Sequence, residues 1–586
     1  MSERKRPDRA KKLQEKRGKS ETVVKASLKK LLLLDGPTKE TACQLIEKRV
    51  LECSKRTYNA SLALNLLVRE RFHGKDVQDV IVPEFWDTTF VRQLFLGIES
   101  AHKPFHDIKV LYNTHPELFP DLERSEGDRN IYSHAATRLA TNIKNHLRLN
   151  LPKVIKRYIR LEIYNEDDQI EAIYQAFGWS RKRELAKEFI VSRKIRVILN
   201  LDDGAELDPS WLKKDDNLPK MLRLFVHVNR LLQKTEGHKL FNILPICRIK
   251  PHFITIDTSS MIPLLKELGL IQTTKTSELD TKSLWESFIN VSKVKTATTT
   301  FTGTIDTDGV AINVHFERPK SASMKDQELD LKGKRLLAID PGRVNIFTIV
   351  ERMENESFKQ YVLTRGHYYK VSGITKAKKK TETWNKAVKK ELTALSLKSP
   401  KSVDLNSFLD YLTTVKAVED KLWKLNFQRK WRDQTLRLYG GKKRAFSNFF
   451  NGLDLDENTI VAFGSAKFSP TGKGELSVPT TRAYKELSYR TRTILIDEFR
   501  TSKVYWKDES ILQKVVKPKA EGNGYESVRG LFWCGSTNSN KFVNRDMNAA
   551  INIWRCGMMY PNRPISLTRI QGQARINQTV GKIIPK

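Results

Sequence analysis

Apolar residues recur with a helical period over much of the first 235 residues. From about 38 to 72 they return every three or four positions, as on one face of a helix. The helical pattern continues to about 235, and residues 129–160 combine it with many Arg and Lys. Such a segment is usually a solvated helix face, although it also suits a helix facing a phosphate backbone. Residues 22–34 alternate more weakly and predict a strand.

The pattern changes at about residue 240. FNILPICRIKPHFITIDTS and TTTFTGTIDTDGVAINVHFERP, both within 240–318, are rich in β-branched residues and have turn signals between them. They predict a small β domain. The polar residues 320–334 predict a linker.

After the linker the chain has an α/β pattern. Apolar runs predict strands at LLAID (336–340), VNIFTIV (344–350), KQYVLTR (359–365), TIVAFGSAKF (459–468) and TRTILIDEF (491–499). Residues 376–434 are basic and predicted to be helical, and MNAAINIW forms the last predicted helix, with Met547, Ala550, Ile551 and Trp554 on one face. These patterns together predict a multidomain protein of the α/β plus α+β class.

The composition adds a strong positive charge. The 586 residues include 104 Lys and Arg against 68 Asp and Glu, a net charge of +36. This imbalance indicates a polyanionic partner, with nucleic acid as the leading candidate. No apolar run approaches the roughly 20 residues of a membrane span, so we expect no membrane partner. Five scattered cysteines indicate a reducing compartment rather than a disulfide framework.

The N-terminal stretch is the most basic part of the chain. Its first 20 residues hold nine Lys and Arg, three acids and almost no apolar residues. This composition predicts a disordered basic tail. A nuclear localisation signal, an arm on nucleic acid and a solubilising tail are all consistent with it.

Three acids lie at the boundaries of predicted α/β elements. Asp340 ends the run LLAI, Glu498 follows the run TILID, and Asp546 begins the last helix. Alone, they would be a β-turn acid before Pro341, a solvated acid at a strand end and a helix N-cap. Together they occupy the positions where α/β folds build sites. Three converging carboxylates need cations, and magnesium prefers oxygen ligands. Two such ions can support phosphodiester hydrolysis.

The residues around these acids carry a family resemblance. LLAIDPGRVN, IDEFRTS and NRDMNAAINI resemble the RuvC-like nuclease motifs of the TnpB/Fanzor family, which are RNA-guided DNA endonucleases of transposable elements. The match is closer to the eukaryotic Fanzor branch, whose glutamate lies in a D-E-F/Y-x-T-S stretch, here 497–502. The resemblance implies that Asp340, Glu498 and Asp546 are the catalytic residues and bind two Mg²⁺ ions. Glu457, just before the predicted central strand, is a weaker alternative to Glu498.

The resemblance also implies a domain organisation. It covers 330–586 through motifs and 22–325 through layout alone. The implied fold is an RNase H-like (RuvC) mixed sheet with flanking helices, a helical recognition lobe and a small β-barrel wedge domain. The implied segments are a basic tail over 1–21, the first part of the wedge over 22–37, the recognition lobe over 38–235, the rest of the wedge over 236–325, and the nuclease domain over 330–586, with a helical insertion at 370–450 and a degenerate zinc-ribbon-like loop at 503–543.

The chain departs from the family at the zinc ribbon. The family usually carries paired C-x-x-C motifs between its second and third acids, whereas TSKVYWKDES has no cysteine and the stretch beginning at Cys534 keeps one of a pair. Structural zinc needs four ligands. We therefore expect no zinc, and we expect packing of Trp506, Phe532 and Trp533 to hold this loop.

The function implied by the resemblance is RNA-guided cleavage of DNA by two-metal-ion chemistry. The implied partners are a guide (omega-type) RNA and a double-stranded target DNA with a target-adjacent motif, bound by a monomeric ribonucleoprotein in the nucleus. One alternative is an RNA-guided DNA-binding protein that does not cut. Another is a different transposon-encoded nuclease or a transposase, although a DDE transposase orders its acids D…D…E and this chain orders them D…E…D.

Seven basic residues are candidates for contacts with nucleic acid. They lie beside the predicted acids or in the lysine-rich helix, and ordinary surface charge is the alternative explanation. These residues are Lys376, Lys378, Lys379, Lys380, Arg500, Lys503 and Arg545.

Overall fold

The protein has two compact units of mixed helix and sheet. The computed structural model describes residues 19–96, 106–119, 128–162, 190–201, 207–319, 330–466, 468, 478–520, 524–537, 539–568 and 580–583. Unit 1 comprises residues 1–320 and 383–436, and unit 2 comprises residues 321–382 and 437–586. The predicted tail falls almost wholly outside the described residues, as does most of the linker.

The described strands of unit 1 form one antiparallel sheet in the order β1-β4-β3-β2. Its strands are β1 (Lys19–Ser27), β2 (Ile254–Asp257), β3 (Thr300–Thr307) and β4 (Ala311–Pro319). β1 pairs with β4 along its whole length, from Lys19 opposite Pro319 to Ser27 opposite Ala311. The two sequence-distant segments predicted to share a β domain are therefore paired. β1 is shorter than the strand predicted over 22–34, because a helical turn follows it at Leu28–Leu31.

The described helices of unit 1 and this sheet enclose one large core, and a smaller apolar cluster lies around Val388, Leu422 and Leu425. The helices are α2 (Leu28–Leu31), α3 (Gly36–Phe72), α4 (Thr88–Leu96), α5 (His106–Thr114), α6 (Asp128–Glu162), α8 (Ile190–Leu199), α9 (Pro209–Lys213), α10 (Leu218–Lys234), α11 (Thr258–Glu267), α12 (Thr281–Phe288), α15 (Lys389–Leu397) and α16 (Leu405–Asn426), with short 3₁₀ turns at Pro116–Leu118, Asp215–Asn217, Thr276–Glu278 and Lys386–Val388.

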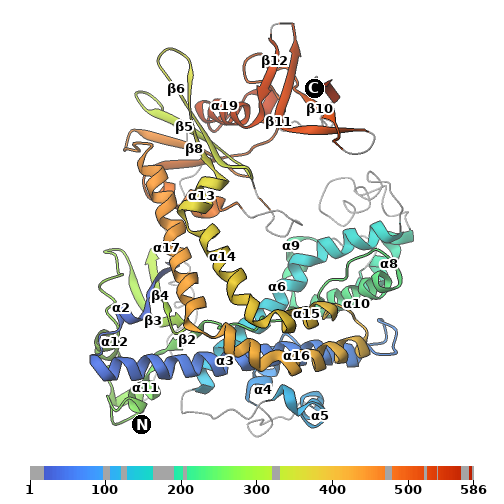
Figure 1. Cartoon of the computed structure of the whole chain (residues 1–586), viewed down its shortest axis with the longest axis vertical. Coiled ribbons are helices and arrows are strands. Elements are labelled where there is room, and N and C mark those ends of the chain that lie inside the picture. The colour runs from blue at the N-terminus through green and yellow to red at the C-terminus, as the bar shows by residue number, and fades with distance from the viewer. Residues whose placement is uncertain are drawn as a thin grey trace, which may run out of the picture. The chain divides into compact units, whose positions relative to one another are not determined.

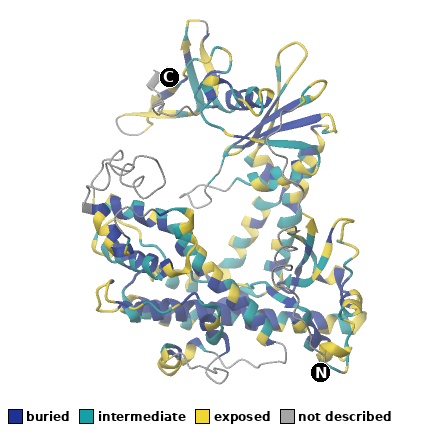
Figure 2. Cartoon of the chain, turned by 180° about the vertical axis from the view of Figure 1, so that it is seen from behind, coloured by how far each residue is buried: buried dark blue, intermediate teal, exposed yellow. Residues whose placement is uncertain are grey.

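The longest helix, α3, runs through the middle of this core (Figures 1 and 2). Every residue from Arg56 to Arg69 is buried, so this half of α3 is covered on all sides. Helices predicted over 38–72 and 129–160 are present as α3 and α6.

The middle of the predicted nuclease insertion belongs to unit 1. The sequence predicted residues 370–450 as part of the nuclease domain, but residues 383–436 group with unit 1. The apolar face of α16 is part of the unit 1 core, and the segment before this helix is bound by the buried guanidinium of Arg69. This guanidinium donates hydrogen bonds to the carbonyls of Ser402 at 2.9 Å and Pro400 at 2.8 Å, and it lies 4.0 Å from the centre of the Phe408 ring. The chain crosses between the units inside α14 (Ile374–Asn385) and α17 (Arg429–Asn451).

Unit 2 contains a five-stranded mixed sheet in the order β7-β6-β5-β8-β9. β5 pairs antiparallel with β6, and β6 antiparallel with β7, whereas β8 and β9 run parallel to β5. The strands are β5 (Arg335–Pro341), β6 (Asn345–Arg352), β7 (Phe358–Thr364), β8 (Thr459–Gly464) and β9 (Arg492–Ile496). Each of the five apolar runs predicted as strands is present.

Helices cover both faces of this sheet, which explains why β5 and β8 are continuous apolar runs. Leu337 and Ile339 of β5 pack on one face with α17 and α18 (Thr480–Ser488). Leu336 and Ala338 pack on the other face with α19 (Arg545–Met558). α13 (Arg365–Val371) follows β7, and a 3₁₀ turn at Ile565–Leu567 follows α19.

The segment predicted as a loop at 503–543 is mostly strand. β10 (Gln513–Pro518), β11 (Tyr525–Ser536), β12 (Ser539–Asn544) and β13 (Val580–Ile583) form a second sheet in the order β12-β11-β10-β13. Trp506 and Phe532 pack against its small apolar cluster, as predicted. Trp533 instead pairs edge-to-face with Phe542, with ring centres 4.8 Å apart.

Among the helices that the structure describes, none combines the length and the apolar character that crossing a bilayer requires.

Replacing Arg69 with methionine should loosen α16 from α3. The change leaves the buried carbonyls of Ser402 and Pro400 without a donor, at a cost on the order of 3 kcal/mol. We expect faster hydrogen–deuterium exchange along α16, measured by mass spectrometry. Arg71→Met is the matched control, because Arg71 is half-exposed and pairs with Asp107 at the surface. Equal exchange of α16 in both variants would contradict this role.

Candidate active site

A pocket of about 340 Å³ lies beside the predicted acids of unit 2. Its lining includes Asp340 and Glu498, together with Arg545 and Ala549 from the start of α19. The C-terminal ends of the parallel strands β5 and β8 lead into it, as is common for sites in α/β folds.

Asp340 lies inside the sheet rather than in a turn. It pairs with Thr348 in the β5–β6 ladder, and its side chain is buried, with 9% of its surface exposed. Burial, followed by the nearby charges of Glu498 and Asp546, raises its pKa well above the usual range, while Arg545 opposes this shift. Its carboxylate accepts no hydrogen bond from a described residue. The ionised form of Asp340 therefore requires a cation.

Glu498 reaches the pocket from the turn after β9. Its Oε1 accepts a hydrogen bond from the Ala466 amide at 2.9 Å. Burial raises its pKa to about 7, against that hydrogen bond and with a small addition from Asp497. Asp497 itself is exposed and pairs with Arg563 at 3.6 Å, so its carboxylate is directed elsewhere.

The Glu498 carboxylate occupies space that a side chain on the central strand would otherwise fill. Gly464 ends β8, and a Cβ added there would overlap Oε1 of Glu498 and come within 2.7 Å of Cδ of Pro341. The acid thus lies over the end of β8 although it comes from another strand. Glu457, the weaker alternative, is exposed and precedes the opposite end of β8.

Asp546 is not the N-cap of α19. That role belongs to Asn544, whose Oδ1 accepts hydrogen bonds from the amides of Asp546 and Met547, each at 3.0 Å. Asp546 instead lies in the first turn, with its side chain 15% exposed. Its Oδ1 accepts from Arg545 at 2.8 Å and its Oδ2 from Asn345 at 3.3 Å. Its carboxylate is therefore held in place by two residues of the predicted motifs.

Two buried asparagines of α19 fix the turn that carries Glu498. The side-chain amides of Asn548 and Asn552 both donate to the carbonyls of Thr501 and Val504, at 2.8–3.1 Å. Oδ1 of Asn548 also accepts from the Trp506 amide at 3.1 Å. This asparagine clamp joins the helix that bears Asp546 to the turn after Glu498. The sequence places both asparagines in the NRDMNAAINI motif without indicating their role.

Three arginines line the pocket with the acids, namely Arg343, Arg529 and Arg545. Only Arg545 was predicted. Arg343 directly follows the turn after Asp340, a position that could have indicated it. Arg529 lies on β11 where the pairing with β10 shifts register, so only the tertiary fold brings it here.

The other predicted basic residues do not line this pocket. Arg500 has φ 60° in the turn after Glu498, and its guanidinium lies 5.4 Å from the centre of the Phe499 ring. Lys503 lies further along the same turn, which the asparagine clamp holds. The four lysines of α14, Lys376, Lys378, Lys379 and Lys380, are all exposed.

The chemistry of the donors fits magnesium, although the carboxylates form no closed cage. No three His, Cys, Asp or Glu side chains in the described ranges are arranged as a ready-made metal-binding group. Magnesium commonly takes only one or two carboxylates and completes its shell with water and substrate phosphate. The buried, unbonded carboxylate of Asp340 between two further acids fits that requirement.

Hydrogen bonds link two segments of the region that the sequence predicted to be a degenerate zinc-ribbon-like loop. The Cys534 thiol lies 3.1 Å from the Ser510 hydroxyl, which donates to Asp508 at 2.6 Å. Ser536 also donates to Asp508 at 2.6 Å. Burial opposes these bonds, but together they lower the pKa of Asp508 to about 2. The β11 end of the second sheet is thus tied to the 505–510 turn by hydrogen bonds.

The comparisons with known proteins concern unit 1 rather than this site. A family described as a domain of unknown function (DUF8286) matches residues 254–318, which include β2, β3 and β4. No curated protein matches the chain.

Replacing Asn548 or Asn552 with leucine should release the turn after Glu498. Each change removes one of the two asparagine donors of each carbonyl, and it should destabilise unit 2 by about 2 kcal/mol. We expect faster hydrogen–deuterium exchange over residues 499–506 and a lower melting temperature. Asn562→Leu serves as the control, because Asn562 is exposed beyond α19. Unchanged protection of 499–506 in both clamp variants would rule out the clamp.

Proposed function

We propose that this protein is an RNA-guided DNA endonuclease of the Fanzor type, encoded by a transposable element. The observation that carries the proposal is that Asp340 and Glu498 line one pocket, while the charge of Asp546, from a third part of the chain, lies near enough to raise the pKa of Asp340. Their order along the chain, D…E…D, is that of RuvC-like nucleases.

The architecture supports this proposal in two ways. A mixed sheet in the order β7-β6-β5-β8-β9, with its first three strands antiparallel and helices on both faces, is what an RNase H-like domain requires. We assign the antiparallel sheet of unit 1 to the wedge barrel and the helices of unit 1 to the recognition lobe.

The proposed chemistry is hydrolysis of a DNA phosphodiester. Asp340, Glu498 and Asp546 would hold two Mg²⁺ ions, which supply activation of water and stabilisation of the leaving oxygen. Arg343, Arg529 and Arg545 give the pocket a basic wall that attracts the scissile phosphate. The asparagine clamp would hold the turn that carries Glu498 in a fixed position relative to the helix that carries Asp546.

The partners follow from the same proposal. A guide RNA would pair with one DNA strand, while the protein binds the backbones and a short motif beside the target. The net charge of +36 supports a partner with many phosphates. The exposed lysines of α14 are proposed backbone contacts. The basic N-terminal tail supports a nuclear location.

Cleavage should require Mg²⁺, the guide RNA and all three acids. We would co-express the protein with the RNA flanking its own element and assay plasmids that carry a guide-matched target and a randomised flank. Asp546→Ala and Glu498→Gln should reduce the rate at least about a thousandfold, as expected for residues that hold catalytic ions. Guide-dependent binding without cutting, in the wild type as well, would instead support an RNA-guided DNA-binding protein.

Asp340→Asn should abolish cleavage and yet stabilise the metal-free protein. Burial and two neighbouring acids disfavour the Asp340 carboxylate in the folded state, so a neutral amide removes that repulsion. We expect a higher melting temperature in EDTA than for the wild type, and a smaller rise on adding Mg²⁺. A lower melting temperature in EDTA would contradict this account.

Gly464→Ala should displace Glu498 and also force a shift of Pro341 at the end of β5. The new methyl group overlaps the Glu498 carboxylate, which must leave the Ala466 amide. We expect Mn²⁺, used as a probe for Mg²⁺, to bind at least about tenfold more weakly in calorimetry. Gly366→Ala is the control, because a Cβ there meets no atom within 4 Å. Equal Mn²⁺ affinity in both variants would contradict this placement of Glu498.

A further inference from the structure

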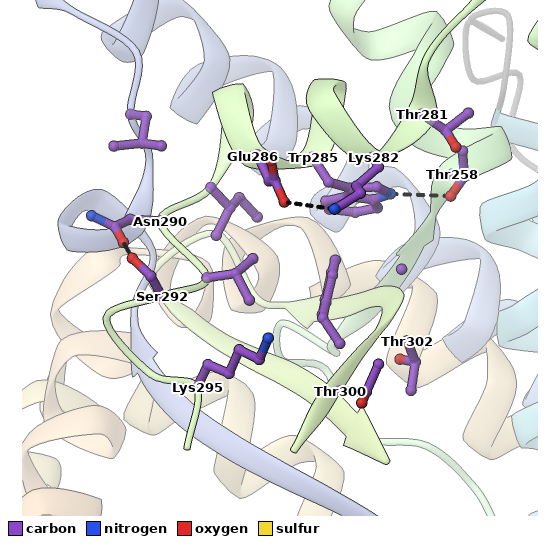
Figure 3. A pocket seen from close by; sticks show the side chains of 15 residues that line it. Thr258, Thr281, Lys282, Trp285, Glu286, Asn290, Ser292, Lys295, Thr300 and Thr302 are labelled. Carbon is purple, nitrogen blue, oxygen red and sulfur yellow. Dashed lines mark hydrogen bonds and ion pairs between the residues drawn. The ribbon is translucent and has the colours of Figure 1, made fainter. Parts of the chain in front are cut away.

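A second pocket lies in unit 1, between the start of α12 and the start of β3 (Figure 3). Its volume is about 750 Å³, within the range of sites for small ligands. The buried residues Trp285 and Ile289 form its apolar floor, and Leu33, Val291 and Phe301 contribute more exposed walls. Most of its lining belongs to the segment matched by the domain of unknown function.

The shape of this pocket is fixed by contacts around Trp285. The indole Nε1 donates to the Thr258 hydroxyl at 3.0 Å, and the Phe301 ring meets the indole edge-to-face at 5.2 Å. The β3–β4 pairing is irregular between Phe301 and Ile305, where Gly303 has φ 71°. This bulge turns the strand beside the pocket, so the cavity exists before any ligand arrives.

The rim of the pocket carries hydroxyl groups and two lysines. Thr281, Thr300 and Thr302 line the pocket (Figure 3), and the last two are exposed. The Thr302 hydroxyl donates to the His315 carbonyl at 3.1 Å and can still accept a hydrogen bond. Lys282 is 84% exposed and its ion pair with Glu286, at 4.0 Å, is too long and too solvated to neutralise it. The ammonium group of Lys295 has no partner among the described residues. The lining thus offers two cations and one carboxylate, that of Glu286, a net positive charge above an apolar floor.

We propose that this pocket takes one unstacked nucleotide of a single-stranded nucleic acid. An aromatic and aliphatic interior suits the faces of a base, and threonine hydroxyls can bind the polar edges of a base or sugar. Lys282 and Lys295 suit the phosphates on either side of the nucleotide. This inference rests on the proposed function only in taking nucleic acid as the partner.

Charge argues against the N-terminal tail of the chain as the occupant. Its first 20 residues carry nine Lys and Arg, three acids and almost no apolar side chains. The two lysines would repel this tail, and the apolar floor would lack a complement. A nucleotide matches both the floor and the rim. Guide RNA and displaced DNA share this chemistry, so the two sources are separated by experiment.

The test uses the full-length protein in EDTA, so that binding is measured without cleavage. The probes are a 20-nucleotide RNA of mixed sequence and the DNA of the same sequence, followed by fluorescence anisotropy over a range of salt. Lys282→Gln combined with Lys295→Gln should weaken binding about tenfold and reduce the slope of log affinity against log salt by about 1.4, or about 0.7 for each lost phosphate contact. Lys266→Gln combined with Lys275→Gln is the control, since both lysines are exposed and neither lines the pocket.

A second variant tests the interior of the pocket. Phe301→Leu keeps an apolar wall but removes the flat ring, and it should weaken binding about fivefold or more. Phe427→Leu, another half-buried phenylalanine of unit 1, is the control. Probes carrying 4-thiouridine or 4-thiothymidine should photocrosslink to peptides within 281–303.

Crosslinks from RNA alone would assign the nucleotide to the guide, and crosslinks from DNA alone would assign it to the target. Unchanged affinity and salt slope in both pocket variants, with crosslinks only outside 281–303, would overturn the inference. That result would leave guided cleavage intact. Loss of guided cleavage with the crosslinks retained would instead overturn the proposed endonuclease.

Discussion

The burial of the Asp340 carboxylate near two further acids is the constraint on which the candidate active site depends. Asp340 is buried in a central strand beside the charges of Glu498 and Asp546, with no hydrogen bond from a described residue to offset them. Left to themselves, such groups would separate or take up protons. The surrounding structure opposes both outcomes, because each acid is attached to a rigid element. The ionised carboxylates are therefore stabilised by bound cations, and the proposed Mg²⁺ ions would supply that positive charge.

Three local features of the structure keep the acids in place: a glycine, a backbone amide and a pair of asparagines. Gly464 leaves space over β8 for the Glu498 carboxylate, and the Ala466 amide binds it there. Asn548 and Asn552 bind the turn after Glu498 from the helix that carries Asp546. Because the two asparagines are one helical turn apart, they contact the same pair of carbonyls. The motif NRDMNAAINI therefore contains the carboxylate of Asp546 and also the asparagines whose hydrogen bonds hold the turn that carries Glu498.

Much of the fold could be predicted from periodicity alone. The buried runs around Asp340 and before Glu498 predicted strands, and the one-sided apolar pattern after Asp546 predicted a helix, because burial imposes those periods. Periodicity could not predict which segments, distant in the sequence, pack into the same unit. Residues 383–436 join unit 1 through the apolar face of α16, with Phe408 and Leu412 in the unit 1 core, and through hydrogen bonds from Arg69 to backbone carbonyls. The apolar period predicts the helix but not the core against which it packs.

The candidate site shows the same division between local and tertiary information. The positions of Asp340 and Asp546 could be predicted because each acid belongs to a local motif. The N-cap alternative for Asp546 was a local inference too, and Asn544, two residues earlier, takes that role. Arg529 gave no signal, because its place in the pocket depends on a register shift between β10 and β11.

The placement of Glu498 shows how a carboxylate can lie over the end of a strand that does not itself carry it. The proposed chemistry would need an oxygen donor over the end of β8, whichever strand carries that donor. A glutamate on β8 would supply that donor directly, whereas here glycine at 464 vacates the space and the turn after β9 fills it. Both changes are required together, because a side chain at 464 would exclude Glu498. A glycine at the end of a central strand, followed by a glutamate just beyond the next parallel strand, is therefore a pattern to look for where the expected central acid is missing.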